Sequence, residues 1–198
     1  MILVVAKAKA LYYFTRLCLD PSRTNDSINL QRQVDKLATP KQRKRYGIKV
    51  PDNKAPAGKM HVNSLGGKMQ IFLGPGMAEL TIYKNPDDDF ERFTNDMWFG
   101  HNVTHVLLDA DISAEGEMKT FGFLVAQYPS PMAVLLVAMG VLNTLFNMRD
   151  CNTRFRALFD GWASGRIADS IVGVDWNKYW GWSLSDVRDQ FRINLGTV

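Results

Sequence analysis

A stretch of 29 residues without a charged side chain, residues 120–148, limits the folds that this chain can adopt. Surface helices and strands carry charged side chains on their outer faces, so most of this stretch must be buried. The residues Tyr128-Pro129-Ser130-Pro131 divide it, and a serine followed by a proline is a typical helix start. We therefore predict a buried apolar helix near 131–148.

The apolar segments of the chain do not predict a membrane protein. The run from Pro131 to Leu142 has 12 residues, whereas a helix needs about 20 to cross the hydrocarbon layer. No basic region precedes the apolar residues 1–5 and no clear cleavage site follows them, so we expect no signal peptide. Cys18 and Cys151 have no paired spacing and predict reduced thiols, with one long-range disulfide as the alternative. We expect a cytoplasmic protein and no membrane partner.

Mid-chain residues show the alternation that is typical of strands. In residues 59–84 apolar and polar side chains alternate, and Gly66-Gly67 and Gly74-Pro75-Gly76 divide the segment into three. Short apolar runs separated by glycine turns predict a three-stranded antiparallel meander. Residues 103–109 and 121–126 are further apolar runs, which we predict as two more strands. About five strands are therefore expected in the middle of the chain.

Helices are predicted on both sides of these strands, from apolar spacing and from capping residues. For residues 2–19 a helix is favoured over a strand. The other predicted helices are one capped by Ser27, one from Thr39 to Gly47, one from Asn85 to Gly100, one between Asn152 and Gly161, and one from Ser183 to Gly196. Helices and clustered strands together predict an α+β fold.

Opposite charges are sorted along the chain. Residues 1–60 hold 13 Lys and Arg against 4 Asp and Glu, whereas residues 79–117 hold 10 acidic residues against 2 basic ones. Prolines and small residues in 48–58 indicate a loop. We predict a basic helical region at 1–58 and an α+β core at 59–198, which together form one folded unit.

This sorting predicts contacts between protein surfaces. Copies of the chain could join head to tail, basic segment against acidic segment. We therefore predict a non-enzymatic assembly or adaptor protein, either a homo-oligomer or a subunit of a larger protein particle, viral or otherwise. An aromatic cluster supplies a candidate interface, with core packing as the alternative interpretation. Its members are Trp176, Tyr179, Trp180 and Trp182.

A second candidate surface is a basic stretch that is opposed by one acidic residue, Asp52. Clustered positive charge attracts phosphates, because each neutralised phosphate releases counterions. Three interpretations stay open: a solvated face, contact with an acidic protein, and binding of nucleic acid without sequence preference. The stretch comprises Lys41, Arg43, Lys44, Arg45, Lys49, Lys54 and Lys59.

The leading interpretation needs no cofactor, but one group of residues suits metal chemistry. On a strand, His105, Asp109 and Asp111 share one face, and two carboxylates at a strand end can hold Mg²⁺ or Mn²⁺. Residues 106–112 resemble the Asp-x-Asp strand ends of sugar-nucleotide transferases and primase-like polymerases. The alternative function is therefore metal-dependent phosphoryl or nucleotidyl transfer. His101 and His105 would face together only on a helix, which this region does not predict.

Overall fold

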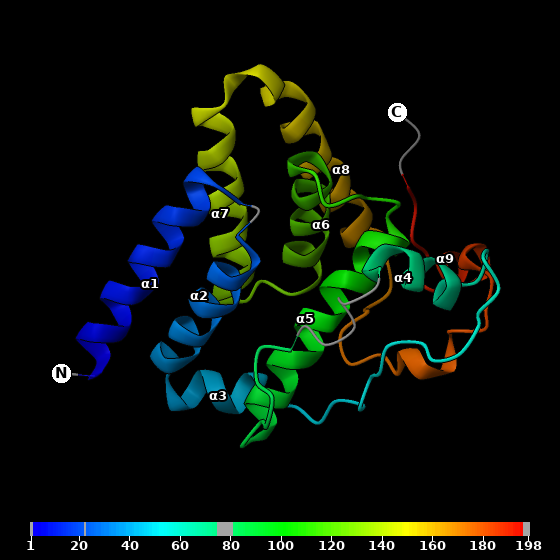
Figure 1. Ribbon diagram of the computed structural model, residues 1–198, viewed down its shortest axis with the longest axis horizontal. Coiled ribbons are helices and arrows are strands. Elements are labelled where there is room, and N and C mark those ends of the chain that lie inside the picture. Colours follow the sequence, from blue (N-terminus) through cyan, green and yellow to red (C-terminus); the bar gives the residue numbers. More distant parts are fainter. Residues whose placement is uncertain (1, 22, 75–80, 196–198) are drawn as a thin grey trace.

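The computed structural model describes residues 2–21, 23–74 and 81–195, and helices make up its framework (Figure 1). The α-helices of these residues are α1 (Ile2–Leu19), α2 (Thr24–Leu37), α3 (Pro40–Tyr46), α4 (Leu65–Leu73), α5 (Asp89–Leu107), α6 (Ala114–Gln127), α7 (Pro131–Phe146), α8 (Cys151–Ile167) and α9 (Leu184–Gln190), and two short 3-10 helices are η1 (Met148–Asp150) and η2 (Trp176–Lys178). In the described ranges the only β-type pairing is an isolated bridge between Ser64 and Ser183. The prediction of an α+β fold with a meander of about five strands is therefore wrong.

Helices α6 and α8 pack with their backbones in close contact. A Cβ atom on Gly122 of α6 would lie 2.1 Å from the carbonyl oxygen of Leu158, and one on Gly161 of α8 would lie 1.9 Å from that of Lys119. Both distances are shorter than any van der Waals contact, so side chains at these positions would force the helices apart. The two glycines fix how closely α8 covers α6.

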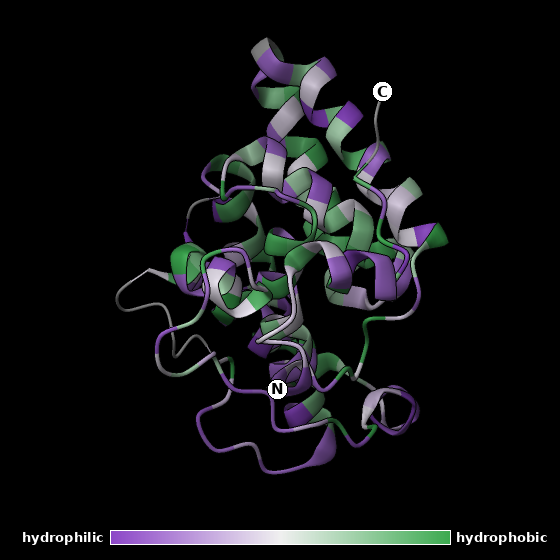
Figure 2. Ribbon diagram, turned by 90° about the vertical axis from the view of Figure 1, so that its right-hand side faces the viewer, coloured by the Kyte–Doolittle hydropathy of each residue, from purple (hydrophilic) through white to green (hydrophobic). Residues whose placement is uncertain are grey.

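Two hydrophobic cores lie on different sides of α6. The aromatic core joins α4, α5, α9 and the segment around η2, and it includes Leu65, Met69, Val103, Leu107, Phe123, Trp176, Trp180 and Phe191. The cavity core joins α1, α2, α6 and α7, and it comprises Leu17, Cys18, Leu30, Phe121, Met132, Leu136 and Met139. Figure 2 shows hydrophobic residues gathered in the central helices and hydrophilic residues on the long loops at the bottom of that view.

The segment that was predicted as a meander contains helix α4. Ser64 caps this helix, because its side chain accepts a hydrogen bond from a backbone N–H of the first turn at 3.1 Å. Leu65, Met69 and Leu73 repeat every four residues and are buried in the aromatic core. Ile71 should share a face with Met69 in a strand, but it is exposed.

The Gly66-Gly67 pair is a site of close packing within α4 and not a hairpin turn. A Cβ on Gly66 would lie 2.8 Å from the carbonyl oxygen of Trp180, and one on Gly67 would lie 2.0 Å from that of His61. Some predicted features lie outside the described residues. They are Pro75 and Gly76 of the second turn, Leu80 of the third strand, and Gly196 at the end of the last helix.

The two further strands are also helical: residues 103–107 close α5, and residues 121–126 belong to α6. Both segments are almost wholly buried, so their apolar side chains do not reveal the 3.6-residue period. The helix predicted near 131–148 forms as α7, but it is not buried on all faces, since Val134, Leu145 and Phe146 are exposed.

Capping residues located three of the helix starts. Thr39, Ser130 and Ser183 each accept a backbone hydrogen bond at the start of α3, α7 and α9, as predicted. The start at Asn85 and the end at Gly100 are wrong, because α5 is capped by Asp88 and continues to Leu107. Similarly, α2 begins at Thr24 and not after Ser27, and α8 continues through Gly161 to Ile167.

The opposite charges of the N-terminal and middle segments meet within the chain. Helix α3 packs on the start of α5, where the Arg43 guanidinium lies 3.0 Å from the Asp88 carboxylate and over the ring of Phe90. Asn53 donates a hydrogen bond to Asp96, also on α5. We predicted that the basic and acidic segments pair between copies of the chain. The Arg43–Asp88 ion pair instead joins these two segments within one chain. The division into regions 1–58 and 59–198 stays a prediction.

No helix in the described ranges is long and apolar enough to cross a bilayer. Cys18 and Cys151 are both free thiols. A cytoplasmic location stays a prediction.

Candidate metal centre

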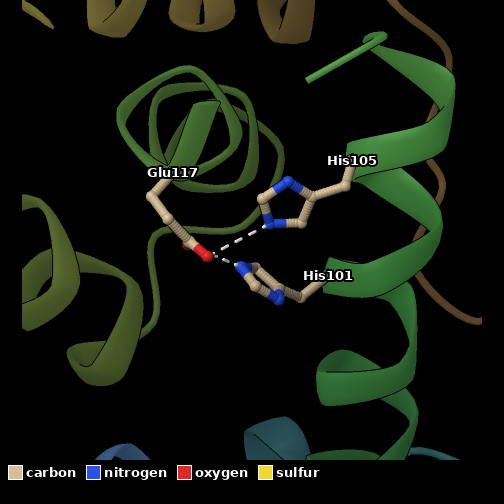
Figure 3. Close-up of side chains that lie close together, drawn as sticks. All are labelled: His101, His105 and Glu117. Carbon is tan, nitrogen blue, oxygen red and sulfur yellow. Dashed lines mark hydrogen bonds and ion pairs between the residues drawn. The ribbon is translucent and has the colours of Figure 1, made fainter. Parts of the chain in front are cut away.

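Helices α5 and α6 bring two histidines and a glutamate together (Figure 3). His101 and His105 are one turn apart on α5, so their side chains leave the same face of that helix. Glu117 lies in the first turn of α6, whose start is fixed by Ser113 accepting a hydrogen bond from the Gly116 N–H. We call His101, His105 and Glu117 the His–His–Glu cluster.

The ligand atoms of the cluster converge on one point. The Nε2 atom of His101 lies 3.3 Å from Glu117 Oε2, and the Nε2 atom of His105 lies 3.5 Å from Glu117 Oε1. One atom of each residue lies within 4.8 Å of the other two, and this is the only such group of three among the described residues. Two imidazole nitrogens and one carboxylate oxygen at these separations suit a divalent transition metal.

The orientation of the His105 ring is fixed by its second nitrogen. Nδ1 lies 3.2 Å from the carbonyl oxygen of Ala110 and 3.3 Å from the hydroxyl of Thr120. Donation from Nδ1 to the carbonyl would leave Nε2 free to exchange its proton for a metal ion on the side that faces Glu117. Metal-binding histidines usually have such an outer partner. Asp109 makes this possible, because its left-handed backbone (φ 51°) returns the chain so that Ala110 reaches His105.

The cluster keeps its carboxylate ionised. Burial would raise the pKa of Glu117, but hydrogen bonds and positive charge from His101 and His105 oppose it and bring this pKa to about 2. An ionised carboxylate is the form that binds a metal ion.

His101 also lines a large apolar cavity on the side of the cavity core. The cavity has a volume of about 330 Å³ and is lined by residues of α1, α2, α3, α5, α6 and α7. Trp98, one turn before His101 on α5, also lines it, and their rings are stacked with centroids 5.8 Å apart. The indole N–H of Trp98 and the Nδ1 atom of His101 are buried without a hydrogen-bond partner. The His–His–Glu cluster and the cavity therefore share the His101 side chain.

The carboxylates predicted as metal ligands lie elsewhere. Asp109 and Asp111 are exposed in the turn between α5 and α6, and neither belongs to the His–His–Glu cluster. Asp111 accepts hydrogen bonds from the N–H and hydroxyl of Ser113, which lower its pKa. Only His105 is common to the predicted and observed groups. The pairing of His101 with His105 was missed because the segment was predicted as a strand.

Two members of the basic stretch form ion pairs. Arg43 pairs with Asp88, and Lys54 pairs with Asp52. The other five side chains are exposed on α3 and on the loop that follows it: Lys41, Lys44, Arg45, Lys49 and Lys59. Contact with nucleic acid or an acidic partner stays a prediction.

The aromatic cluster divides into buried and exposed members. Trp176 and Trp180 are buried in the aromatic core, and Tyr179 packs against it. Trp182 is exposed, with its ring against that of Tyr179. Two of the four predicted interface residues thus follow the alternative of core packing.

Comparisons with known proteins found a matching family, over the half of the chain that contains the cluster, and a similar solved structure. The family described as "Coenzyme Q (ubiquinone) biosynthesis protein Coq4" matches residues 99–196, which is 98 of the 198 residues. No curated protein matches the chain. A crystal structure from Nostoc punctiforme, of a protein named for ubiquinone biosynthesis, is similar over 95% of this chain and 98% of that chain, with a TM-score of 0.75 and 18% sequence identity.

At 18% sequence identity, the Nostoc structure shows only that the two proteins share this helical fold. Both names point to ubiquinone biosynthesis. The prediction of an assembly or adaptor protein, including a viral particle subunit, is therefore wrong, and so is the alternative of phosphoryl or nucleotidyl transfer. The half of the chain that holds His101, His105 and Glu117 resembles the Coq4 family of ubiquinone biosynthesis proteins.

Proposed function

We propose that this protein is a Coq4-type enzyme that binds a divalent transition metal at the His–His–Glu cluster and acts on a prenylated aromatic intermediate of ubiquinone biosynthesis. The observation that carries the proposal is the convergence of two imidazole nitrogens and one carboxylate within 4.8 Å, beside an apolar cavity. Three protein ligands leave a coordination position open, which is typical of catalytic rather than structural zinc sites.

The donor set favours some metals over others. Imidazole nitrogen suits zinc, iron and manganese, whereas magnesium prefers oxygen ligands. Of the two ions predicted from the sequence, manganese fits this cluster better than magnesium does, and zinc fits best. Once bound, such a metal would supply a Lewis acid for an oxygen substituent of the aromatic ring.

The cavity supports the substrate class. Ubiquinone consists of an oxygenated ring with an isoprenoid tail, so its precursors present a polar head and a long apolar chain. The cavity walls are mainly hydrophobic, with Phe93, Met97 and Leu136 among them, and suit the tail. Trp98 and His101 line this same cavity with their rings stacked, so the cavity reaches the proposed metal centre through His101. The ring would then lie at the metal centre and the tail in the cavity.

Zinc titration by calorimetry tests the metal centre. Glu117→Gln keeps the shape of the side chain but removes its charge, and His101→Ala removes one ligand. Each should weaken zinc binding at least about 100-fold, because three ligands are the minimum for a stable site. The matched control is Asp109→Asn with Asp111→Asn, which should bind zinc as the wild type does. Equal binding by Glu117→Gln and the wild type would contradict the proposed centre.

Ubiquinone content tests the pathway. In a strain that lacks its own Coq4 protein, the wild-type chain should restore ubiquinone and Glu117→Gln should not. Restoration by both chains would show that the cluster is dispensable, and restoration by neither, with the wild type folded, would separate this chain from the pathway.

A further inference from the structure

Two cationic side chains from other helices bind the C-terminal end of α5. Arg188, on α9, donates from Nε to the carbonyl oxygen of Leu107 at 2.8 Å and from Nη2 to that of Val106 at 3.3 Å. Lys119, on α6, donates from Nζ to the carbonyl oxygen of Leu108 at 3.0 Å. Positive charge is favourable at this place, because the last carbonyl groups of a helix carry a partial negative charge.

These contacts lie on the turn that orients His105. Val106 follows His105 directly in the sequence, and the same turn leads on to Ala110. Ala110 binds His105 at two points: its N–H donates to the His105 carbonyl oxygen at 2.9 Å, and its own carbonyl oxygen lies 3.2 Å from His105 Nδ1. A shift of this turn would therefore move the partner of Nδ1 and rotate the ring, whose Nε2 atom lies 3.5 Å from Glu117.

Helix α9 gives Arg188 a rigid base. Val187, the residue before it, is fully buried in the aromatic core, and Phe191 at the end of α9 is buried there too. Arg188 itself is half-buried, which lowers its pKa, and the negative charge of Asp109 opposes this. Two donors of one planar guanidinium can bind two adjacent carbonyl groups, whereas a lysine offers a single nitrogen. The aromatic core can thus hold the end of α5 in place.

We propose that Arg188 is a positioning residue of the metal centre, which together with Lys119 fixes the end of α5 and keeps the Nε2 atom of His105 aimed at Glu117. Both cations bind backbone carbonyl groups, so they act through the position of α5 and not on the ion itself. Lys119 also ties α5 to the helix that carries Glu117. The inference rests on the proposed function, because it concerns residues that act through a proposed ligand.

Zinc titration by calorimetry compares two arginine replacements. Arg188→Met keeps the length of the side chain but removes both hydrogen bonds to α5. The matched control is Arg154→Met, because Arg154 is buried on α8 and donates to Asn143 at 2.9 Å. Both variants should lose stability, but only Arg188→Met should weaken zinc binding, by about tenfold. Arg188→Lys keeps the charge with one donor nitrogen, so its affinity should lie between those of the wild type and Arg188→Met.

NMR of the histidine rings in the zinc-loaded protein separates positioning from a general loss of stability. The His105 Nδ1 proton should exchange slowly with water in the wild type, since His105 is 1% exposed and Nδ1 faces the Ala110 carbonyl. Arg188→Met should accelerate this exchange at least about tenfold by loosening the turn, and Arg154→Met should leave it unchanged. Lys119→Met should also accelerate it, and it tests the same turn if Arg188→Met does not fold.

Two results would overturn this inference alone. One is zinc binding by Arg188→Met as tight as that by Arg154→Met. The other is a wild-type exchange rate of the His105 Nδ1 proton in both Arg188→Met and Lys119→Met. Absence of zinc binding by the wild type would instead overturn the proposed function, and this inference with it. The two failures are therefore distinguishable by the wild-type titration.

Discussion

The two cores of this protein differ in how completely they are filled. In the aromatic core, Leu65, Leu107 and Trp176 are fully buried among other side chains. Beside the cavity core, the helices leave about 330 Å³ of apolar space, although Leu136 and Phe121 are well buried. The His–His–Glu cluster stands between them, on α5 and α6. The difference indicates that one side holds the ligands rigidly and the other admits an apolar molecule.

The largest expected effect comes from truncation in the filled core. Leu107→Ala should lower the free energy of unfolding by about 3–4 kcal/mol, because the packed surroundings cannot collapse onto the space. Leu136→Ala, beside the existing cavity, should cost about 2 kcal/mol. Urea unfolding of both variants measures the difference, and equal losses would contradict the contrast between the cores.

The contact of α6 with α8 supports both cores and should be nearly as sensitive. Gly161→Ala should destabilise the protein by about 2–3 kcal/mol, because its Cβ would lie 1.9 Å from a backbone oxygen. The control is Gly100→Ala, within α5, where a Cβ has no neighbour within 4 Å. That change should stabilise the protein by about 0.5–1 kcal/mol. Thermal unfolding gives the sign of each effect.

Filling the cavity should affect binding more than stability. Ala10→Trp would occupy space at the cavity wall and should weaken binding of an apolar fluorescent probe about tenfold, or about 1.4 kcal/mol. The free energy of unfolding should change by less than this. Unchanged probe affinity would show that the probe binds elsewhere.

The smallest expected effect is a pH dependence of stability carried by two carboxyl groups, of which Asp35 is buried and Asp96 is partly buried. Burial raises the pKa of Asp35, which lines the cavity, and of Asp96, beside Asn53, to about 6 each. A folded-state pKa above the unfolded value of about 4 means that stability is greatest below pH 4 for these groups and is lost as pH rises through 6.

Asp96→Asn should therefore remove on the order of 1 kcal/mol of the fall in stability between pH 5 and pH 7. Asp35→Asn should act similarly on the cavity side. Urea unfolding of each variant at a series of pH values measures these effects. If a variant showed the same pH dependence of stability as the wild type, the replaced carboxyl group would not be its cause.

Local signals along the chain predicted helix ends better than they predicted strands. Thr39, Ser130 and Ser183 were recognised because a cap needs only one side chain and its neighbours. Helix α4 was missed because its glycines resemble a turn. Gly66 is instead required by the approach of the Trp180 backbone, which is distant in sequence. Burial on nearly all faces disguised the end of α5 as a strand.

The same error hid most of the candidate site. His105 was selected as a metal ligand, but a strand pairs it with Asp109 and Asp111, whereas a helix pairs it with His101. Glu117 comes from a second helix, and no local pattern links it to α5. The spacing of His101 and His105, at i and i+4, was the one signal that could have located the centre.

The His101 ring belongs both to the His–His–Glu cluster and to the cavity wall. If the proposed centre were loaded with cobalt, the visible absorption of the ion would report any tilt of that imidazole. An apolar guest in the cavity would then change the colour of the protein without touching the ion, so the occupancy of the cavity could be followed by eye.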